Sequence, residues 1–167
     1  MRLEEWFSIY RKLKLNTDMR KIIEGNVDLR KLHLTELFDL SDVEVTGEFN
    51  CSHNNLTNLV GSPKSIGGSF SCLYNNLTSL IGATQTIGYD FNCSYNNLTN
   101  LIGAPKTVKG CFHCEGNNLT SLEGIPKRIG YGTGFFKNFY ISKQLKDRFP
   151  EEYIRSLSKI RGSVLYW

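Results

Sequence analysis

Hydrophobic positions in the central part of the chain recur every 21 residues. The motif Asn-Asn-Leu-Thr begins at Asn54, Asn75, Asn96 and Asn117, and hydrophobic columns keep the same period around it. These columns are Phe49, Phe70, Phe91 and Phe112; Cys51, Cys72, Cys93 and Cys114; Leu59, Leu80, Leu101 and Leu122; and Val45, Ile66, Ile87, Val108 and Ile129. One unit cannot bury these side chains alone, so the pattern predicts a solenoid whose stacked coils share one core.

Each unit is predicted to contain a short strand, a turn and an irregular return. The strand is Phe-x-Cys, whose alternate residues point inward. The first Asn of the motif closes the strand, and stacked copies of its amide are expected to satisfy the backbone of neighbouring turns. An unpaired buried amide would otherwise cost about 1–3 kcal/mol. Gly-x-Pro, as at Gly61 and Pro63, turns the chain back toward the next strand.

The repeat resembles a known family. The segment I-G-G-S-F-S-C-L-Y-N-N-L at 66–77 resembles the leucine-rich-repeat core L-x-x-L-x-L-x-x-N-x-L, with Phe and Cys replacing two leucines and one extra residue after Ile66. The longer pattern L-T-S-L-x-G-x-P-K-x-I-G-G-x-F-x-C is similar to leucine-rich-repeat proteins of large tailed bacteriophages, and G-N-V-D-L at 25–29 also fits. The resemblance covers about 25–136 and implies a leucine-rich-repeat-like right-handed coil with short parallel strands. It carries no catalytic residue.

Both ends of the array are expected to be capped, because repeat stacks must shield their terminal core. Residues 1–24 are predicted to form an N-terminal cap with a helix at 3–13, residues 25–136 the array, and residues 137–167 a C-terminal helical cap of the same structural domain. Within that cap, 142–149 and 150–160 are predicted as helices. The apolar tail 164–167 is predicted to form a final strand, with an exposed docking peptide as the alternative.

Composition narrows the function classes. The chain of 167 residues is 40% hydrophobic and 22% charged, which excludes wholesale disorder. It has no run of 18 apolar residues and no signal-peptide pattern at its start, so neither a membrane span nor secretion is expected. Four of the five cysteines follow the repeat period, unlike a disulfide framework or a zinc ribbon. We therefore expect packed, reduced thiols and a cytoplasmic location, which is the host cytoplasm for a phage-encoded protein.

The net charge of +4 is unevenly spread, because both ends are basic while 34–130 is mildly acidic. A nucleic-acid binder usually concentrates Lys and Arg on its recognition surface, so this distribution argues against nucleic acid as a partner. A basic row beside the Gly-x-Pro corners is expected to be mainly a solvated edge, with contact to an acidic partner as the alternative. The row consists of Lys64, Lys106, Lys109, Lys127 and Arg128.

Outward strand positions and a flanking aromatic column form the candidate binding surface, which the solenoid would present as a concave face. Tyrosines are common in protein interfaces, although packing of the turns explains the column equally well. The candidate partner-binding residues are Glu48, Asn50, Ser71, Leu73, Tyr74, Asp90, Asn92, Tyr95, His113 and Glu115.

One strand face also gathers reactive side chains, namely Cys111, His113 and Glu115. A zinc site would need further ligands from neighbouring coils. A Cys–His nucleophilic pair would need a hydrogen bond, whereas residues two apart on a strand lie about 6.6 Å apart. We therefore predict neither a metal, a cofactor nor a catalytic residue. The function expected is a small protein-binding solenoid. The resemblance implies a phage protein that binds a host cytoplasmic protein, such as a defence or metabolic factor. The alternatives are a metal- or thiol-dependent enzyme at this patch and a structural, self-assembling protein.

Overall fold

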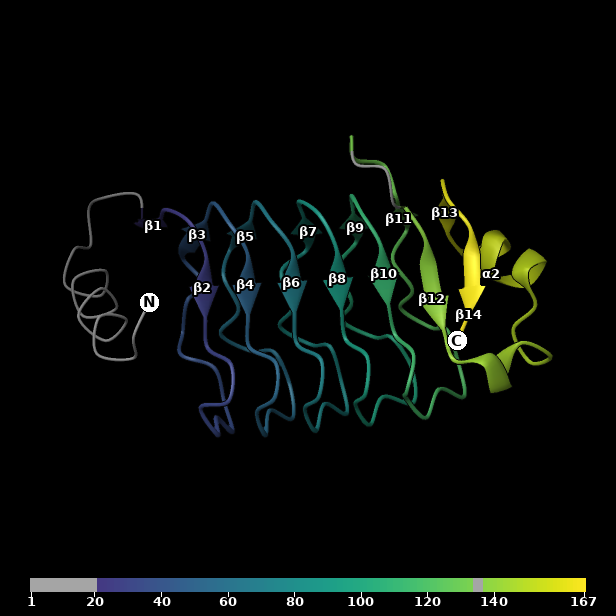
Figure 1. Cartoon of the computed structure of the whole chain (residues 1–167), viewed down its shortest axis with the longest axis horizontal. Helices are drawn as coiled ribbons and strands as arrows, with labels where there is room; N and C mark the ends of the chain where they lie inside the picture. The colour runs from purple at the N-terminus through teal and green to yellow at the C-terminus, as the bar shows by residue number, and fades with distance from the viewer. Residues whose placement is uncertain (1–20, 134–136) are drawn as a thin grey trace.

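The computed structural model describes residues 21–133 and 137–167, which wind into a solenoid of about seven coils. The short strands of successive coils stack in parallel, and Figure 1 shows them as a row along the long axis of the molecule. The prediction of a repeat solenoid is therefore confirmed. The helix predicted at 3–13, and Phe135 and Phe136 as residues that close the core, lie outside the described residues.

Each coil contributes one strand to each of two seven-stranded parallel sheets, which we call the front and back sheets. The front sheet contains β2 (Val27–Asp28), β4 (Phe49–Asn50), β6 (Phe70–Ser71), β8 (Phe91–Asn92), β10 (Phe112–His113), β12 (Phe139–Ile141) and β14 (Val164–Tyr166). The back sheet contains β1 (Lys21–Ile23), β3 (Val43–Val45), β5 (Ser65–Ile66), β7 (Thr86–Ile87), β9 (Thr107–Val108), β11 (Arg128–Ile129) and β13 (Lys159–Ile160).

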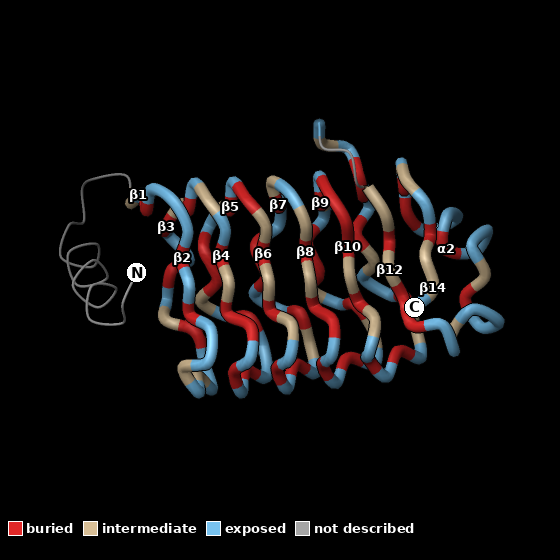
Figure 2. The backbone as a smooth tube through the Cα atoms, in the orientation of Figure 1, coloured by how far each residue is buried: buried red, intermediate tan, exposed pale blue. Residues whose placement is uncertain are grey.

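The core follows directly from the 21-residue period, because the register places each residue beside its own copy in the next coil. Phe70 pairs with Phe49 on one side and with Phe91 on the other. The ring centroids of Phe70 and Phe91 are 5.3 Å apart, and both side chains are fully buried. The predicted Phe, Cys, Leu and Val/Ile columns are all buried, and Figure 2 shows the buried positions alternating with exposed ones along the coils.

The first Asn of each motif forms the predicted ladder between coils. The Asn75 side chain donates to Cys51 O of the preceding coil and to Cys72 O of its own coil, both at 3.1 Å. Its Oδ1 accepts the Leu56 backbone N–H at 3.0 Å. The same pattern recurs at Asn96 and Asn117. The side-chain amide thus gives hydrogen-bond partners to buried backbone groups that lie outside the paired strands.

One expectation about the coil is wrong. The return is predicted to be irregular, but it carries the whole back sheet, because each Val or Ile of that column pairs with its neighbours, as Ile66 does with Ile87. The concave shape of the candidate binding surface stays a prediction, and the strand spacing argues against it. Parallel strands stack with the same spacing of about 4.8 Å in both sheets, so neither side is wider than the other and nothing forces the stack to curve.

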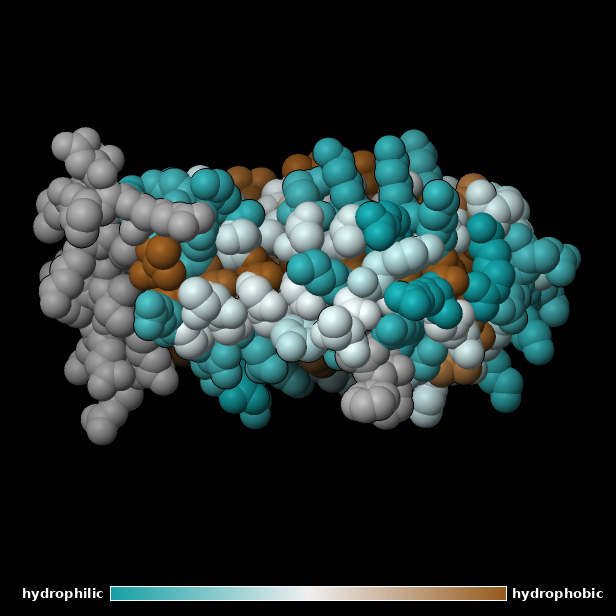
Figure 3. Space-filling model, turned by 90° about the horizontal axis from the view of Figure 1, so that it is seen from above, coloured by the Kyte–Doolittle hydropathy of each residue, from teal (hydrophilic) through white to brown (hydrophobic). Residues whose placement is uncertain are grey.

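The corner between the back and front sheets brings backbones unusually close. A Cβ on Gly88 would overlap the carbonyl oxygen of Gly67 in the preceding coil, so this corner requires glycine. Seen from above, the surface on this side is mainly hydrophilic or intermediate in hydropathy, with smaller hydrophobic areas between (Figure 3).

The C-terminal segment 137–167 extends the solenoid rather than forming a helical cap. Both predicted helices are shorter than expected. In place of a helix at 142–149 there is a single 3-10 turn, η1 (Lys143–Leu145), and in place of one at 150–160 there is α2 (Glu151–Leu157). The chain leaves α2 because the Lys159 N–H bonds to Lys127 O and adds β13 to the back sheet. The predicted final strand is confirmed as β14, which pairs with β12.

Helix α2 contacts β13 at the end of the stack and buries Ile154. In the part of the chain that the structure describes, no helix is long and apolar enough to cross a membrane.

Candidate functional site

The outward side chains of the front sheet form the front face, which contains the surface predicted from sequence. Asn50, Ser71, Asn92 and His113 occupy equivalent positions of β4, β6, β8 and β10 and form one row across the coils. Leu73 and Glu115 lie two residues further along their coils. All ten predicted partner-binding residues retain at least partial exposure, whereas Ser52 and Ser94, at equivalent outward positions, are buried.

The aromatic column beside the front face is a stacked ladder. The ring centroids of His53 and Tyr74 are 4.8 Å apart, and those of Tyr74 and Tyr95 are 4.6 Å apart. Tyr74 and Tyr95 are nevertheless 46% and 49% exposed. All three residues have φ between 51° and 55°, a left-handed conformation that is uncommon for bulky side chains. The ladder ends at Gly116, whose missing side chain leaves space for the Tyr95 ring.

A second aromatic stack continues the front face toward the C-terminus. The His113 and Tyr140 rings are parallel to within 5°, with centroids 4.2 Å apart, and Trp167 lies 6.2 Å beyond Tyr140. Sequence reasoning missed Tyr140 and Trp167 because the period of 21 fails after Ile129. The alignment of Tyr140 with His113 shows only in the sheet register, and Trp167 directly follows β14. The alternation Phe-Tyr-Ile at 139–141 is the one signal that could have indicated a further strand.

His113 and Glu115 form a partly buried ion pair in the middle of the front face. His113 Nδ1 lies 3.5 Å from Glu115 Oε1. Burial lowers the pKa of His113, but the hydrogen bonds with Cys111 and Glu115 outweigh it and raise the pKa to about 9. Burial likewise acts to raise the pKa of Glu115, but the hydrogen bond and charge of His113 bring it below its ordinary value. Both groups are therefore charged at neutral pH.

Cys111 does not lie on the exposed face where the sequence placed it. It is only 3% exposed, and the Asn138 backbone N–H points at its sulfur from 3.4 Å. Asn138, directly before β12, covers it, an arrangement that the repeat does not predict because Asn138 lies beyond the periodic part. The structure does bring Cys111, His113 and Glu115 together, but it leaves the sulfur enclosed, which suits packing better than nucleophilic attack.

The other four cysteines line the interior. Their thiols face the carbonyls of the next coil, as Cys93 Sγ does toward His113 O at 3.2 Å. Burial raises the pKa of the Cys51, Cys72, Cys93 and Cys114 thiols. Such thiols are inert small hydrophobic groups.

The front face also holds buried oxygens without a hydrogen-bond partner. In residues 21–133 and 137–167 these are Ser71 Oγ, Ser94 Oγ and Glu115 Oε2. An unsatisfied buried polar atom costs about 1–3 kcal/mol of stability.

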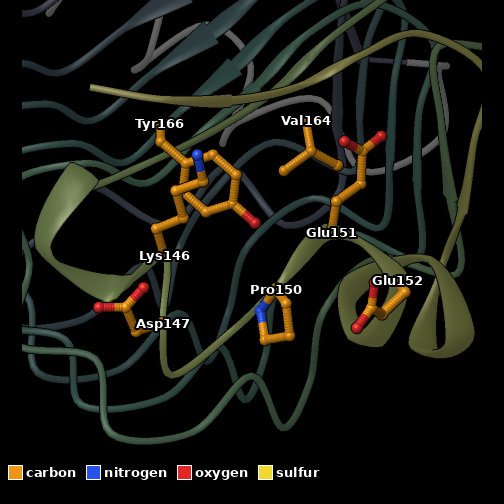
Figure 4. A pocket seen from close by; sticks show the side chains of 7 residues that line it. All are labelled: Lys146, Asp147, Pro150, Glu151, Glu152, Val164 and Tyr166. Carbon is orange, nitrogen blue, oxygen red and sulfur yellow. The ribbon is translucent and has the colours of Figure 1, made fainter.

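Among the described residues, no group of three or more His, Cys, Asp or Glu side chains is arranged to hold a metal ion. An open pocket of about 580 Å³ lies at the C-terminal end of the stack, and its lining includes Tyr166, Lys146 and Glu151 (Figure 4). A second pocket, of about 470 Å³, lies in the first coil at residues 33–39. Both are remote from the His113–Glu115 pair.

The ion pair makes stability depend on pH. Because the folded pKa of His113, about 9, exceeds the ordinary value of 6.5, its contribution is complete below about pH 6.5 and is lost as the pH rises through about 9. An NMR titration should therefore give a His113 midpoint near 9, and Glu115→Gln should lower it. The free energy of unfolding should fall between pH 6.5 and 9 more in the wild type than in Glu115→Gln. A wild-type midpoint near 6.5 would contradict the pairing.

Comparison with known proteins gives no relative for this arrangement: no family model, no curated protein and no solved structure matches the chain.

Proposed function

We propose that the chain is a binding module, not an enzyme, and that its front face docks on another protein. The observation that supports this most directly is the ladder of His53, Tyr74 and Tyr95, which holds large aromatic side chains rigid while leaving the two tyrosines about half exposed. Tyrosines of this kind offer contact area and a polar tip, and they lose little entropy on binding because they are already ordered.

The charged residues of the front face also suit a protein partner. Glu48, Asp90 and Glu115 make the face acidic, with the His113 imidazole as the one charged group that opposes them in this set. The matching surface would supply a Lys or Arg side chain to Glu48 or Asp90 and an apolar group beside Leu73 and the ladder. Burial of such a charged pair together with aromatic anchors is typical of the residues that dominate interface energies.

The resemblance to the repeat proteins of large tailed bacteriophages extends the proposal to a host partner. A phage-encoded binding module acts in the host cytoplasm, where defence and metabolic factors are the available targets. This step rests on the resemblance alone, since a fold does not define a function.

The ladder variant Tyr74→Gly/Tyr95→Gly is expected to abolish partner capture while the protein stays folded. Glycine fits the left-handed backbone, as Gly116 does in the same column with φ of 67°. The measurement is quantitative affinity capture from host cell lysate with mass spectrometry. Loss of two central aromatic anchors should reduce the recovered partner at least about tenfold.

The matched control is Ile81→Ala/Ile102→Ala, which removes two exposed apolar side chains from a different row of turns. Only a protein that is recovered by the wild type and by this control, and lost with the ladder variant, supports the proposal. Equal recovery by all three forms, or recovery of nothing above background, would rule out the front face as the docking surface.

A further inference from the structure

Six exposed cationic side chains gather on the back sheet over the last three of its strands. Two of them, Arg128 and Lys159, are exposed residues of β11 and β13. The other four flank the ends of β9, β11 and β13, namely Lys106, Lys109, Lys127 and Arg161. The group, which we call the basic back patch, is Lys106, Lys109, Lys127, Arg128, Lys159 and Arg161.

The sheet register forces these charges together. Arg128 pairs directly with Lys159 across β11 and β13. The backbone N–H of Lys159 bonds to Lys127 O, and that of Arg161 bonds to Ile129 O. Adjacent parallel strands are about 4.8 Å apart, and like charges at such opposed positions destabilise a sheet. The patch therefore carries an electrostatic cost in the free protein.

Nothing in the described chain neutralises the patch. None of its six residues forms an ion pair with the other described residues, in contrast to the first coils of the same sheet. There, Lys21 pairs with Asp42, and Lys64 lies 3.7 Å from Glu44.

The repeat itself does not require cations at these positions. The position of Lys106 and Lys127 is Lys64 in one earlier coil but Gln85 in another, and that of Arg128 is Ser65 or Thr86. Arg128, Lys159 and Arg161 are thus the cations that set the C-terminal coils apart from the earlier ones. The one aromatic contact is Arg128, whose guanidinium lies 4.5 Å above the centre of the Tyr131 ring.

We propose that the basic back patch binds the phosphate backbone of duplex nucleic acid without reading its sequence. Duplex DNA carries one negative charge per about 1.7 Å of its axis, a density that matches six unpaired cations within two coil spacings. Lys and Arg on a flat sheet can reach phosphates, but the strands of this patch present no aromatic platform for single-stranded bases. The acidic front face lies on the other side of the coil, so the two surfaces bind different partners.

The patch forms only in the folded chain, which explains why the distribution of charge along the sequence argued against nucleic acid as a partner. The patch combines four residues from the mildly acidic centre with two from the C-terminal segment, Lys159 and Arg161; the four are Lys106, Lys109, Lys127 and Arg128. Only the addition of β13 to the back sheet places Lys159 and Arg161 beside the other four.

The test is fluorescence anisotropy with a labelled 20-base-pair duplex of arbitrary sequence, titrated between 50 and 200 mM salt. Arg128→Ala/Lys159→Ala should weaken binding at least about tenfold and reduce the slope of log K against log salt by about 2. Lys143→Ala/Lys146→Ala, which removes two cations outside the patch, should change neither quantity. Lys106→Ala/Lys127→Ala is a second patch variant, in case the first fails to fold.

Two further arms separate this proposal from its competitors. Tyr74→Gly/Tyr95→Gly should bind the duplex as the wild type does, so failure of the front-face proposal leaves this one intact. Polyglutamate at equal charge concentration should compete poorly. Equal competition by polyglutamate, a duplex affinity that does not depend on salt, or equal losses in the patch and control variants would overturn the proposal.

Discussion

Asn96→Ala is expected to lower the free energy of unfolding by about 3 kcal/mol or more. The Asn96 amide donates to Cys72 O at 3.1 Å and to Cys93 O at 3.0 Å, and its Oδ1 accepts the Leu77 N–H at 3.0 Å. Alanine would leave these backbone groups buried without partners, at about 1–3 kcal/mol for each. Because the amide links two coils, the loss should also lower unfolding cooperativity, as expected for a stack stabilised by nearest neighbours.

The adjacent residue provides the control. Asn97 is exposed, so Asn97→Ala should change the free energy of unfolding by no more than about 0.5 kcal/mol. Asn96→Asp keeps the shape but replaces the donating NH₂ with an acceptor that faces two carbonyl oxygens, and it should destabilise at least as much as alanine does. Denaturant unfolding followed by circular dichroism measures all three. Equal stabilities of the Asn96 and Asn97 variants would show that the ladder does not hold the coils together.

Phe91→Ala is the second change with a large expected effect, about 3–5 kcal/mol of lost stability. Phe91 is fully buried at the centre of the stack, with its ring centroid 5.3 Å from Phe70 and 5.5 Å from Phe112. Removing the ring leaves a cavity that the strands on both sides cannot close, because their register is fixed by Phe70 and Phe112.

Tyr89→Ala removes an aromatic ring two residues away as the matched control. Tyr89 is 55% exposed, so its loss should cost less than about 1 kcal/mol. Phe91→Leu should fall between the two, because leucine fills part of the cavity. Thermal and denaturant unfolding should rank the variants in this order. A Phe91→Ala protein as stable as Tyr89→Ala would mean that the phenylalanine column is not the core of the solenoid.

The two proposed surfaces carry opposite charge on opposite sides of the solenoid. The front face carries Glu48, Asp90 and the charged His113–Glu115 pair, whereas the C-terminal half of the back sheet carries the basic back patch. Because every coil places one strand on each side, a substitution on one face leaves the other in place. The binding experiments on the two faces are therefore independent of each other.

The 21-residue period was enough to predict the solenoid, its core columns and the Asn ladder. One unit cannot bury Phe91, Cys93 and Leu101 by itself, so the recurrence of these residues already implies stacked coils. The aromatic column of Tyr74 and Tyr95 was visible for the same reason, since any residue that repeats with the period must lie beside its own copy.

Outside the periodic part, only the tertiary structure determines which segments pair with each other and which side chains meet as a result. The sequence favoured a helix through Lys159, but β13 forms there because its backbone groups find partners on β11, and no local preference reports such distant pairing. That single addition brings Lys159 and Arg161 into the basic back patch, just as Asn138 covers Cys111 and β12 places Tyr140 on His113. Local pattern therefore determines what a coil must bury, whereas contacts between distant segments determine which charges and rings meet on its surface.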